Sequence, residues 1–84
     1  MGRVVGGDAL TAVCALAAAI ADREVRASAR LLEDLGLDSI QFAELVFATE
    51  ELAGRDAPED LIETWATVAD LAAFVTVARE QAAG

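Results

Sequence analysis

Apolar residues recur at intervals of three and four along most of this chain, the spacing that places side chains on one face of an α-helix. The first stripe follows Asp8, whose carboxylate suits an N-cap, and predicts a helix that ends near residues 21–23. Its apolar members are Leu10, Val13, Cys14, Ala17 and Ile20. Residues 1–7 contain three glycines and no periodic pattern, so we expect a flexible lead-in there.

The pattern is less regular over residues 23–37. Four leucines alternate there with polar residues and glycine, which predicts a long loop held to the core by its leucines. They are Leu31, Leu32, Leu35 and Leu37. The spacing does not decide whether part of residues 23–32 is helical. A connection of this length in so small a domain is often functional.

The clearest helix start follows this segment. Asp38 and Gln41 stand three positions apart, the spacing of an acidic N-cap and a glutamine that reaches back to the cap amide. Apolar residues then continue to Ala53, and Gly54 suits the residue that ends a helix. We expect one face to be core: Phe42, Leu45, Val46, Thr49, Leu52 and Ala53. The opposite face mixes two large apolar side chains with two carboxylates: Ile40, Glu44, Phe47 and Glu51.

Two more helices are expected in the last third of the chain. Pro58 suits the first position of a short helix that ends near residues 62–63, and Glu59 and Asp60 suit its positive N-terminal end. Thr67 then fits an N-cap with Asp70 three residues on. The last apolar stripe is Val68, Leu71, Ala72, Val75 and Ala78, and we expect Trp65 in the core or at its edge.

These elements predict an all-α fold, a small four-helix bundle with a long first loop and a short third helix. The pattern places the domain at residues 8–80 and a C-terminal tail at residues 81–84.

The composition excludes most enzyme chemistry. The chain has 84 residues with no His, and all six basic residues are Arg. Without His there is no Ser-His or Cys-His nucleophile pair and no imidazole metal ligand, and without Lys there is no Schiff base. A domain of this size also has one modest core and no deep cleft between domains. We therefore expect a protein without catalytic residues of its own.

The charge balance narrows the choice of partners. Fifteen acidic residues against six Arg give a formal net charge of −9. Such a chain repels nucleic acid and anionic membranes, which bind proteins through basic faces. We expect it to bind neither, and to dock on basic patches of other proteins.

Two features favour a cytoplasmic location. Cys14 is the only cysteine, so the chain has no internal disulfide, which fits a reducing compartment. The apolar run 9–21 is too short to span a membrane, and only Arg3 precedes it as a basic residue, unlike a secretory signal. We expect an unprocessed cytoplasmic protein.

Ser39 is the residue best placed for chemistry, because it lies in the first turn of the second predicted helix. It has no neighbouring base and is no self-activated nucleophile, but a phosphate ester there would meet the positive helix end and its unpaired N–H groups. Asp38 would oppose that charge. The other serine, Ser28, has no comparable surroundings, and a plain capping role is the structural alternative for Ser39.

The stretch from Leu35 to Leu45, LGLDSIQFAEL, resembles the attachment motif of acyl carrier proteins. In that family Leu-Gly precedes Asp-Ser, Leu or Ile follows the serine, and a Glu stands five residues after it. The resemblance extends over residues 8–80. It implies that Ser39 receives 4′-phosphopantetheine from coenzyme A, and that Asp38 and Glu44 match the neighbouring motif residues.

The resemblance also implies a non-catalytic carrier that holds acyl groups as thioesters. Its partners would be a phosphopantetheinyl transferase and the enzymes that load, extend or tailor the chain through basic docking patches, and it would act as a monomer. Thr49 is polar where the family buries a larger apolar residue. Gln41 stands where fatty-acid carriers are acidic, and Phe42 and Phe47 are bulkier than usual. These departures favour polyketide or mixed secondary-metabolite biosynthesis.

Several alternatives stay open. Ile40, Glu44, Phe47 and Glu51 are expected to contact partners, but the two apolar side chains would serve the fold if partly buried, and the carboxylates are otherwise ordinary solvated charges. Asp34 and Asp38 would at most help to hold the transferase's magnesium, so no permanent metal site is expected. A peptidyl carrier of a nonribosomal pathway has the same fold, and an unmodified acidic helical adaptor is the alternative of a different class. The cargo stays open.

Overall fold

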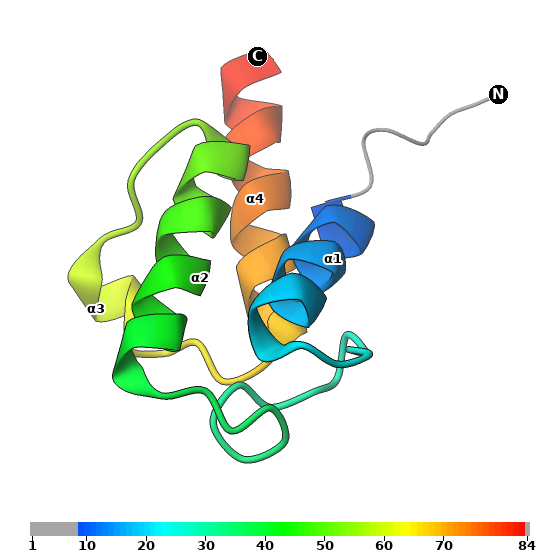
Figure 1. Ribbon diagram of the computed structural model, residues 1–84. Helices are drawn as coiled ribbons and strands as arrows, with labels where there is room; N and C mark the ends of the chain where they lie inside the picture. Colours follow the sequence, from blue (N-terminus) through cyan, green and yellow to red (C-terminus); the bar gives the residue numbers. More distant parts are fainter. Residues whose placement is uncertain (1–8, 84) are drawn as a thin grey trace, which may run out of the picture.

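The computed structural model describes residues 9–83 (Figure 1). Within them the chain forms four helices: α1 (Ala9–Ala21), α2 (Ser39–Ala53), α3 (Glu59–Ile62) and α4 (Val68–Ala83). No β-strand occurs in these residues apart from an isolated bridge between Arg30 and Thr67. The predicted all-α bundle with a short third helix is confirmed. The predicted N-cap Asp8 and the lead-in 1–7 lie outside the described residues.

The three long helices pack against one another in pairs, and α3 lies beside α2 on the outside of the bundle (Figure 1). The C-terminal end of α1, the long connection 22–38 and the N-terminal ends of α2 and α4 all lie at one end of the molecule (Figure 1). Residues far apart in the sequence therefore meet around the start of α2, where Ser39 lies.

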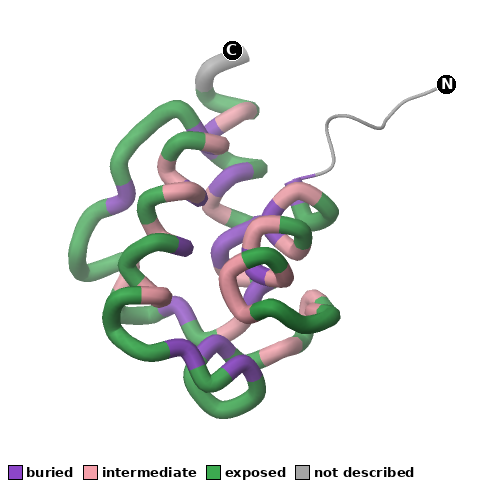
Figure 2. The backbone as a smooth tube through the Cα atoms, viewed as in Figure 1, coloured by how far each residue is buried: buried purple, intermediate pink, exposed green. Residues whose placement is uncertain are grey.

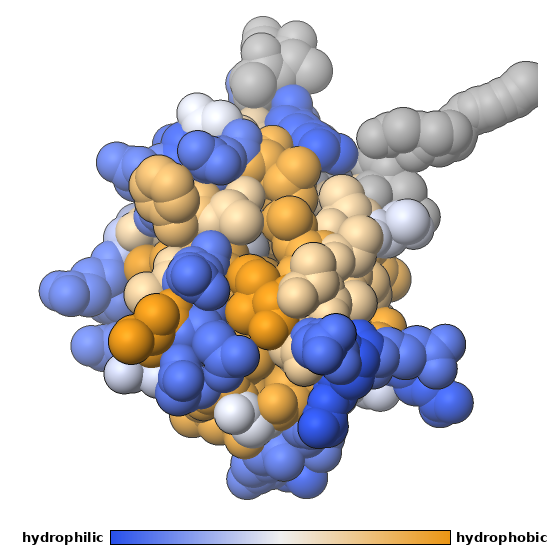
Figure 3. Space-filling model, in the orientation of Figure 1, coloured by the Kyte–Doolittle hydropathy of each residue, from blue (hydrophilic) through white to orange (hydrophobic). Residues whose placement is uncertain are grey.

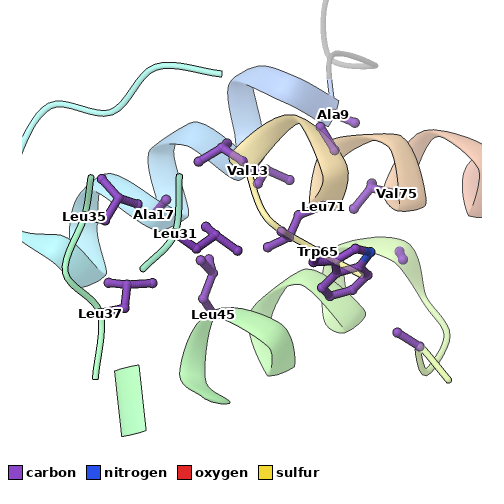
Figure 4. Close-up of a cluster of buried hydrophobic side chains, with 14 of the residues drawn as sticks. Ala9, Val13, Ala17, Leu31, Leu35, Leu37, Leu45, Trp65, Leu71 and Val75 are labelled. Carbon is purple, nitrogen blue, oxygen red and sulfur yellow. The ribbon is translucent and has the colours of Figure 1, made fainter. Parts of the chain in front are cut away.

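The buried side chains form one cluster between these helices and the long loop (Figures 2 and 4). Leu31, Leu35 and Leu37 are buried, as predicted, and Trp65 lies at the core edge with its ring 5.5 Å from that of Phe74. The predicted core faces of α2 and α4 are buried or half-buried. The largest fully buried side chains are Leu31, Leu45, Leu71, Val13, Val68, Val75 and Thr49.

Two predicted core leucines are instead exposed. Leu32 is 65% exposed, because the turn at residues 31–34 points its neighbour Leu31 inward and leaves Leu32 outside. Leu10 is 38% exposed, because the buried stripe of α1 runs through Ala9, Val13 and Ala17 at intervals of four. The prediction was wrong at these two positions. Leu10 directly follows the buried residue Ala9, and Leu32 directly follows the buried residue Leu31.

The long loop has no helix in residues 23–32 but is tied to the start of α4 by backbone hydrogen bonds. The N–H of Leu31 donates to the carbonyl of Ala66 at 2.8 Å, and the N–H of Val68 donates to Ala29 at 3.1 Å. The N–H of Ala69 donates to Ala27 at 3.0 Å. The loop therefore partners N–H groups that the first turn of a helix cannot pair within itself.

Asp70 completes this end of α4. Its Oδ2 accepts from the backbone N–H of Ala66 at 2.8 Å and of Thr67 at 2.9 Å. These hydrogen bonds to the charged form hold the pKa of Asp70 below its ordinary value. The predicted pairing of Thr67 with Asp70 at the helix start is confirmed.

The other helix ends show one correction. Gly54 ends α2 in the left-handed conformation, φ 76°, as expected. Pro58 is the N-cap of α3 in extended conformation, φ −62° and ψ 145°, and not its first helical residue. The carboxylate of Glu50 accepts from the N–H of Ala57 at 2.7 Å, which fixes the chain just before that cap. At the other end α4 continues to Ala83, past residue 80.

Candidate functional site

Ser39 is the first residue of α2 and is exposed. Before it the chain turns at Gly36, whose φ of 64° lies in the left-handed region that favours glycine. Leu35 and Leu37 on either side of Gly36 are buried, so the core anchors the approach to α2. The serine hydroxyl is thereby presented at the surface from an anchored backbone.

The first turn of α2 is closed by a complete capping box. Oδ1 of Asp38 accepts from the N–H of Gln41 at 2.7 Å, and the N–H of Asp38 donates to Oε1 of Gln41 at 3.1 Å. The carboxylate of Asp38 is therefore directed at the helix backbone. The sequence spacing of the two residues predicted this arrangement.

The side-chain amide of Gln41 makes a third contact that sequence reasoning missed. Its Nε2 donates to the carbonyl of Ile20 at 3.3 Å, near the end of α1. The two residues are 21 positions apart, and the hydrogen bond depends on the path of the irregular loop between them. No local pattern signals it.

The outward face of α2 is apolar and acidic together. Ile40 is 71% exposed and Phe47 is 63% exposed, and Glu44 and Glu51 are exposed with them. Apolar side chains interrupted by hydrophilic ones cover α2 in Figure 3. The alternative that Ile40 and Phe47 are partly buried for the fold does not hold. These four residues, called the α2 stripe below, lie together as the periodicity predicted.

Charge is distributed unevenly over the described residues. Helix α2 carries Glu44, Glu50 and Glu51 and no basic residue, and the exposed residues of α3 and its C-cap add three more acidic side chains: Glu59, Asp60 and Glu63. The loop between α1 and α2 carries three arginines: Arg23, Arg26 and Arg30. The same loop also carries five acidic residues, so its charge is mixed, whereas α2 and α3 with its C-cap carry acidic residues only: the acidic residues of the loop are Asp22, Glu24, Glu33, Asp34 and Asp38.

Asp34 is engaged within this loop. Its Oδ2 accepts from the backbone N–H of Arg30 at 2.8 Å, and its carbonyl accepts from Nη1 of Arg23 at 3.1 Å. The guanidinium of Arg30 also pairs with Glu33 and lies 3.9 Å from Asp34. In residues 9–83 no group of three or more Cys, Asp or Glu side chains is arranged to hold a metal ion.

A cleft of about 520 Å³ opens between the loop, α2 and α3. Its apolar wall includes Phe42, which lies one turn beyond Ser39 on α2, and Trp65. Leu31, Leu32 and Ile62 complete that wall, and Arg30, Glu33, Glu63 and Ala66 also line the cleft.

Taken together, the site suits a group attached through a phosphate ester. The hydroxyl of Ser39 is exposed, its helix turn is held by the capping box, and a phosphate on it would lie at the positive end of α2.

No helix in the described part of the chain is long and apolar enough to cross a membrane.

Comparison with known proteins agrees with this geometry. The family model described as "Phosphopantetheine attachment site" matches residues 8–75. A protein of Sulfurovum sp. (strain NBC37-1) named "Acyl carrier protein" is 42% identical to this chain over 52 residues, which are 62% of this chain and 69% of that protein.

Proposed function

This chain belongs to the phosphopantetheine attachment-site family of acyl carrier proteins, and from that premise we propose that Ser39 is the residue that holds its 4′-phosphopantetheine. The chain is a non-catalytic carrier, and a phosphopantetheinyl transferase and acyl-handling enzymes are its partners. The observation that carries the assignment to Ser39 is its exposed hydroxyl at the capped start of α2, inside the Asp-Ser-Ile motif.

The chemistry of attachment divides between the two proteins. The Ser39 oxygen forms a bond to the phosphorus next to pantetheine in coenzyme A, and the bond to the leaving adenosine 3′,5′-bisphosphate breaks. The adjacent carboxylate of Asp38 is held by the backbone N–H of Gln41, and the sequence contains no His. We therefore assign the base that takes the hydroxyl proton to the transferase. Ser39 presents the nucleophile at the N-terminal end of α2, where the helix dipole favours the negative charge of the phosphate. Once attached, the group supplies a thiol that binds acyl groups as thioesters.

The α2 stripe is our proposed docking face. Ile40 and Phe47 offer apolar area that water covers in the isolated chain, and Glu44 and Glu51 lie beside them. A partner that fits has an apolar depression edged by Arg or Lys. Exposed ion pairs contribute little affinity and mainly steer association, so contact of this kind is brief. A carrier that visits several enzymes in turn needs such reversible contacts.

We place the carrier in polyketide or mixed secondary-metabolite biosynthesis. This is supported by Gln41 at a position where fatty-acid carriers are acidic, and by the aromatic residues Phe42 and Phe47. The single cysteine allows no internal disulfide, which fits a reducing cytoplasm. By its resemblance to the family, the carrier acts as a monomer. Loading of the modified protein by an acyltransferase that supplies malonyl units is the expected outcome. Loading by an amino-acid-activating enzyme instead would favour the peptidyl alternative.

The attachment site is tested by intact mass after incubation with coenzyme A, magnesium and a broad-specificity phosphopantetheinyl transferase. The unmodified protein should gain one phosphopantetheine, Ser39→Ala none, and Ser28→Ala one. Ser28 is the only other serine and is also exposed, so it is a matched control. If Ser39→Ala still gains phosphopantetheine, another residue is the attachment site. No gain by any folded variant with an active transferase would favour the adaptor.

The docking face is tested with the same transferase. Glu44→Arg should raise its KM severalfold and leave kcat nearly unchanged, because the charge that meets the partner is reversed while Ser39 is untouched. Glu80→Arg is the control, because Glu80 is also exposed but lies on α4. Equal effects of both substitutions would mean that net charge, and not the α2 stripe, decides docking.

A further inference from the structure

We infer that Gln41 is a positioning residue for the modification of Ser39, acting by tying the first turn of α2 to the end of α1. The inference rests on the proposed role of Ser39. It concerns a different part of the process, namely the fraction of carriers whose serine is held in the helix when the transferase is bound.

The geometry around Gln41 carries the inference. Its backbone N–H donates to Oδ1 of Asp38 at 2.7 Å, and its side-chain Oε1 accepts from the N–H of Asp38 at 3.1 Å. Ser39 lies between these two residues in the sequence, so both hydrogen bonds span it. The remaining side-chain group of Gln41, Nε2, donates to the carbonyl of Ile20 at 3.3 Å. One half-buried side chain thus closes the turn that contains Ser39 and links that turn to a second helix.

Glutamine is required for both roles at once. A glutamate at position 41 keeps an oxygen that accepts from the N–H of Asp38, but it offers no donor to Ile20 when ionised and places a negative charge near that carbonyl. A methionine has similar length and offers neither group. The pair Gln41→Glu and Gln41→Met therefore removes the two side-chain contacts in steps.

Side-chain hydrogen bonds in the first turn of a helix alter the fraction of molecules in which that turn is folded. Helix ends open locally with free energies close to zero, whereas the core opens only with global unfolding. The Ser39 turn lies at an exposed helix end, and the buried residues Leu37 and Leu45 hold only the chain on either side of it. Loss of a hydrogen bond in this turn therefore lowers the fraction of carriers with an ordered Ser39.

The kinetic signature follows from the position of the docking face. Of the α2 stripe, only Ile40 lies in the first turn, whereas Glu44, Phe47 and Glu51 lie further along α2. Most of the docking face is therefore retained when the first turn is open. We expect kcat for phosphopantetheine transfer to fall in Gln41→Glu and to fall further in Gln41→Met. One and two hydrogen bonds of about 1 kcal/mol each set the upper limits of these decreases at about fivefold and about thirtyfold. KM should stay within about twofold of the unsubstituted protein in both.

The experiment measures kcat and KM for each variant by mass-detected transfer from coenzyme A, with amide hydrogen exchange of Gln41 or its replacement and of Phe42 alongside. The N–H of Phe42 bonds to the carbonyl of Asp38 at 2.8 Å, so it reports opening of the same turn without any enzyme. Exchange should accelerate in the same order as kcat falls. Gln81→Glu adds the same charge on α4 as Gln41→Glu and should change neither quantity.

Each result has a distinct meaning. Faster exchange with unchanged kcat in both variants would overturn the inference, because Gln41 would then serve only the fold. A change in KM alone would also overturn it, because Gln41 would then touch the transferase. Modification of Ser39→Ala under the same conditions would instead refute the proposed attachment site, and the exchange data would still report whether Gln41 orders the turn.

Discussion

Replacing Thr49 by valine should leave the stability of the protein nearly unchanged, although it removes a hydrogen bond from the core. Thr49 is fully buried, and its hydroxyl donates to the carbonyl of Leu45 at 2.7 Å. In an α-helix that carbonyl also accepts from the backbone N–H four residues on, which is again that of Thr49. Valine therefore leaves no unpaired acceptor behind, and its shape is nearly that of threonine.

The magnitude follows from opposing terms. Loss of one neutral hydrogen bond costs about 1 kcal/mol. Burying a methyl group in place of the hydroxyl contributes about 0.8 kcal/mol. The cost of the hydrogen bond is already net of the desolvation of the hydroxyl, so the two contributions nearly cancel. Helix propensity is similar for the two β-branched residues and cancels. We expect Thr49→Val to change the free energy of unfolding by less than about 0.5 kcal/mol and Tm by less than about 4 °C.

Urea unfolding followed by Trp65 fluorescence measures this change directly. Trp65 is the only tryptophan and lies 8% exposed against the ring of Phe74, so its emission reports loss of the core. Thr49→Ser is the matched control: it keeps the hydroxyl, loses the methyl group and should be less stable by about 1 kcal/mol. A valine variant that is less stable than the unsubstituted protein by more than about 1 kcal/mol, with the same dependence on urea, would refute the reasoning, because the hydroxyl would then contribute more than one ordinary hydrogen bond.

Three further outcomes are expected. Gly36→Ala and Gly54→Ala should each lower the free energy of unfolding by about 1 kcal/mol, because both glycines have positive φ. An added Cβ would meet nothing within 4 Å at either position, so no steric clash adds to this cost. A difference above about 1 kcal/mol between the two variants in denaturant titrations would contradict this. The free energy of unfolding should fall as pH drops below 3.8, the ordinary pKa of Asp70. Below that pH the unfolded chain binds a proton at Asp70 more readily than the folded chain, whose Asp70 has a lowered pKa, so protonation favours unfolding. Asp70→Asn should lose this acid dependence in urea titrations at pH 3 and 6, and an unchanged slope would exclude Asp70 as its source. The amides of Val68 and Ala69 should be protected in hydrogen exchange although they lie in the first turn of α4, since each donates to the long loop; free exchange at both would disprove that pairing.

The helices could be predicted from the sequence because their signals are local. The apolar spacing of α2 and α4, the Asp38–Gln41 cap and Gly54 all act within a few residues, and each was found where the pattern placed it. The position of Ser39 at the start of α2 followed from the same signals. The α2 stripe followed as well, since residues at intervals of three and four share a face whatever packs behind it.

The remaining features depend on contacts between distant segments. The errors at Leu10 and Leu32 arose because neighbouring residues compete for the same inward position, and the surrounding helices decide which one is buried. The link from Gln41 to Ile20 and the pairing of the loop with α4 join residues at least 21 positions apart. Their geometry is set by the folded chain and has no periodic signal.

The two faces of α2 separate stability from recognition. Leu45 and Thr49 are fully buried on one face, whereas Ile40 and Phe47 are largely exposed on the other. Substitutions on the exposed face remove few native contacts, so they should change the free energy of unfolding by less than about 0.5 kcal/mol. A loss of partner binding on that face therefore reports recognition, whereas a loss that follows a change at Thr49 must first be corrected for stability. Gln41 lies between these cases, because it contacts two helices yet is proposed to act on the ordering of a single turn.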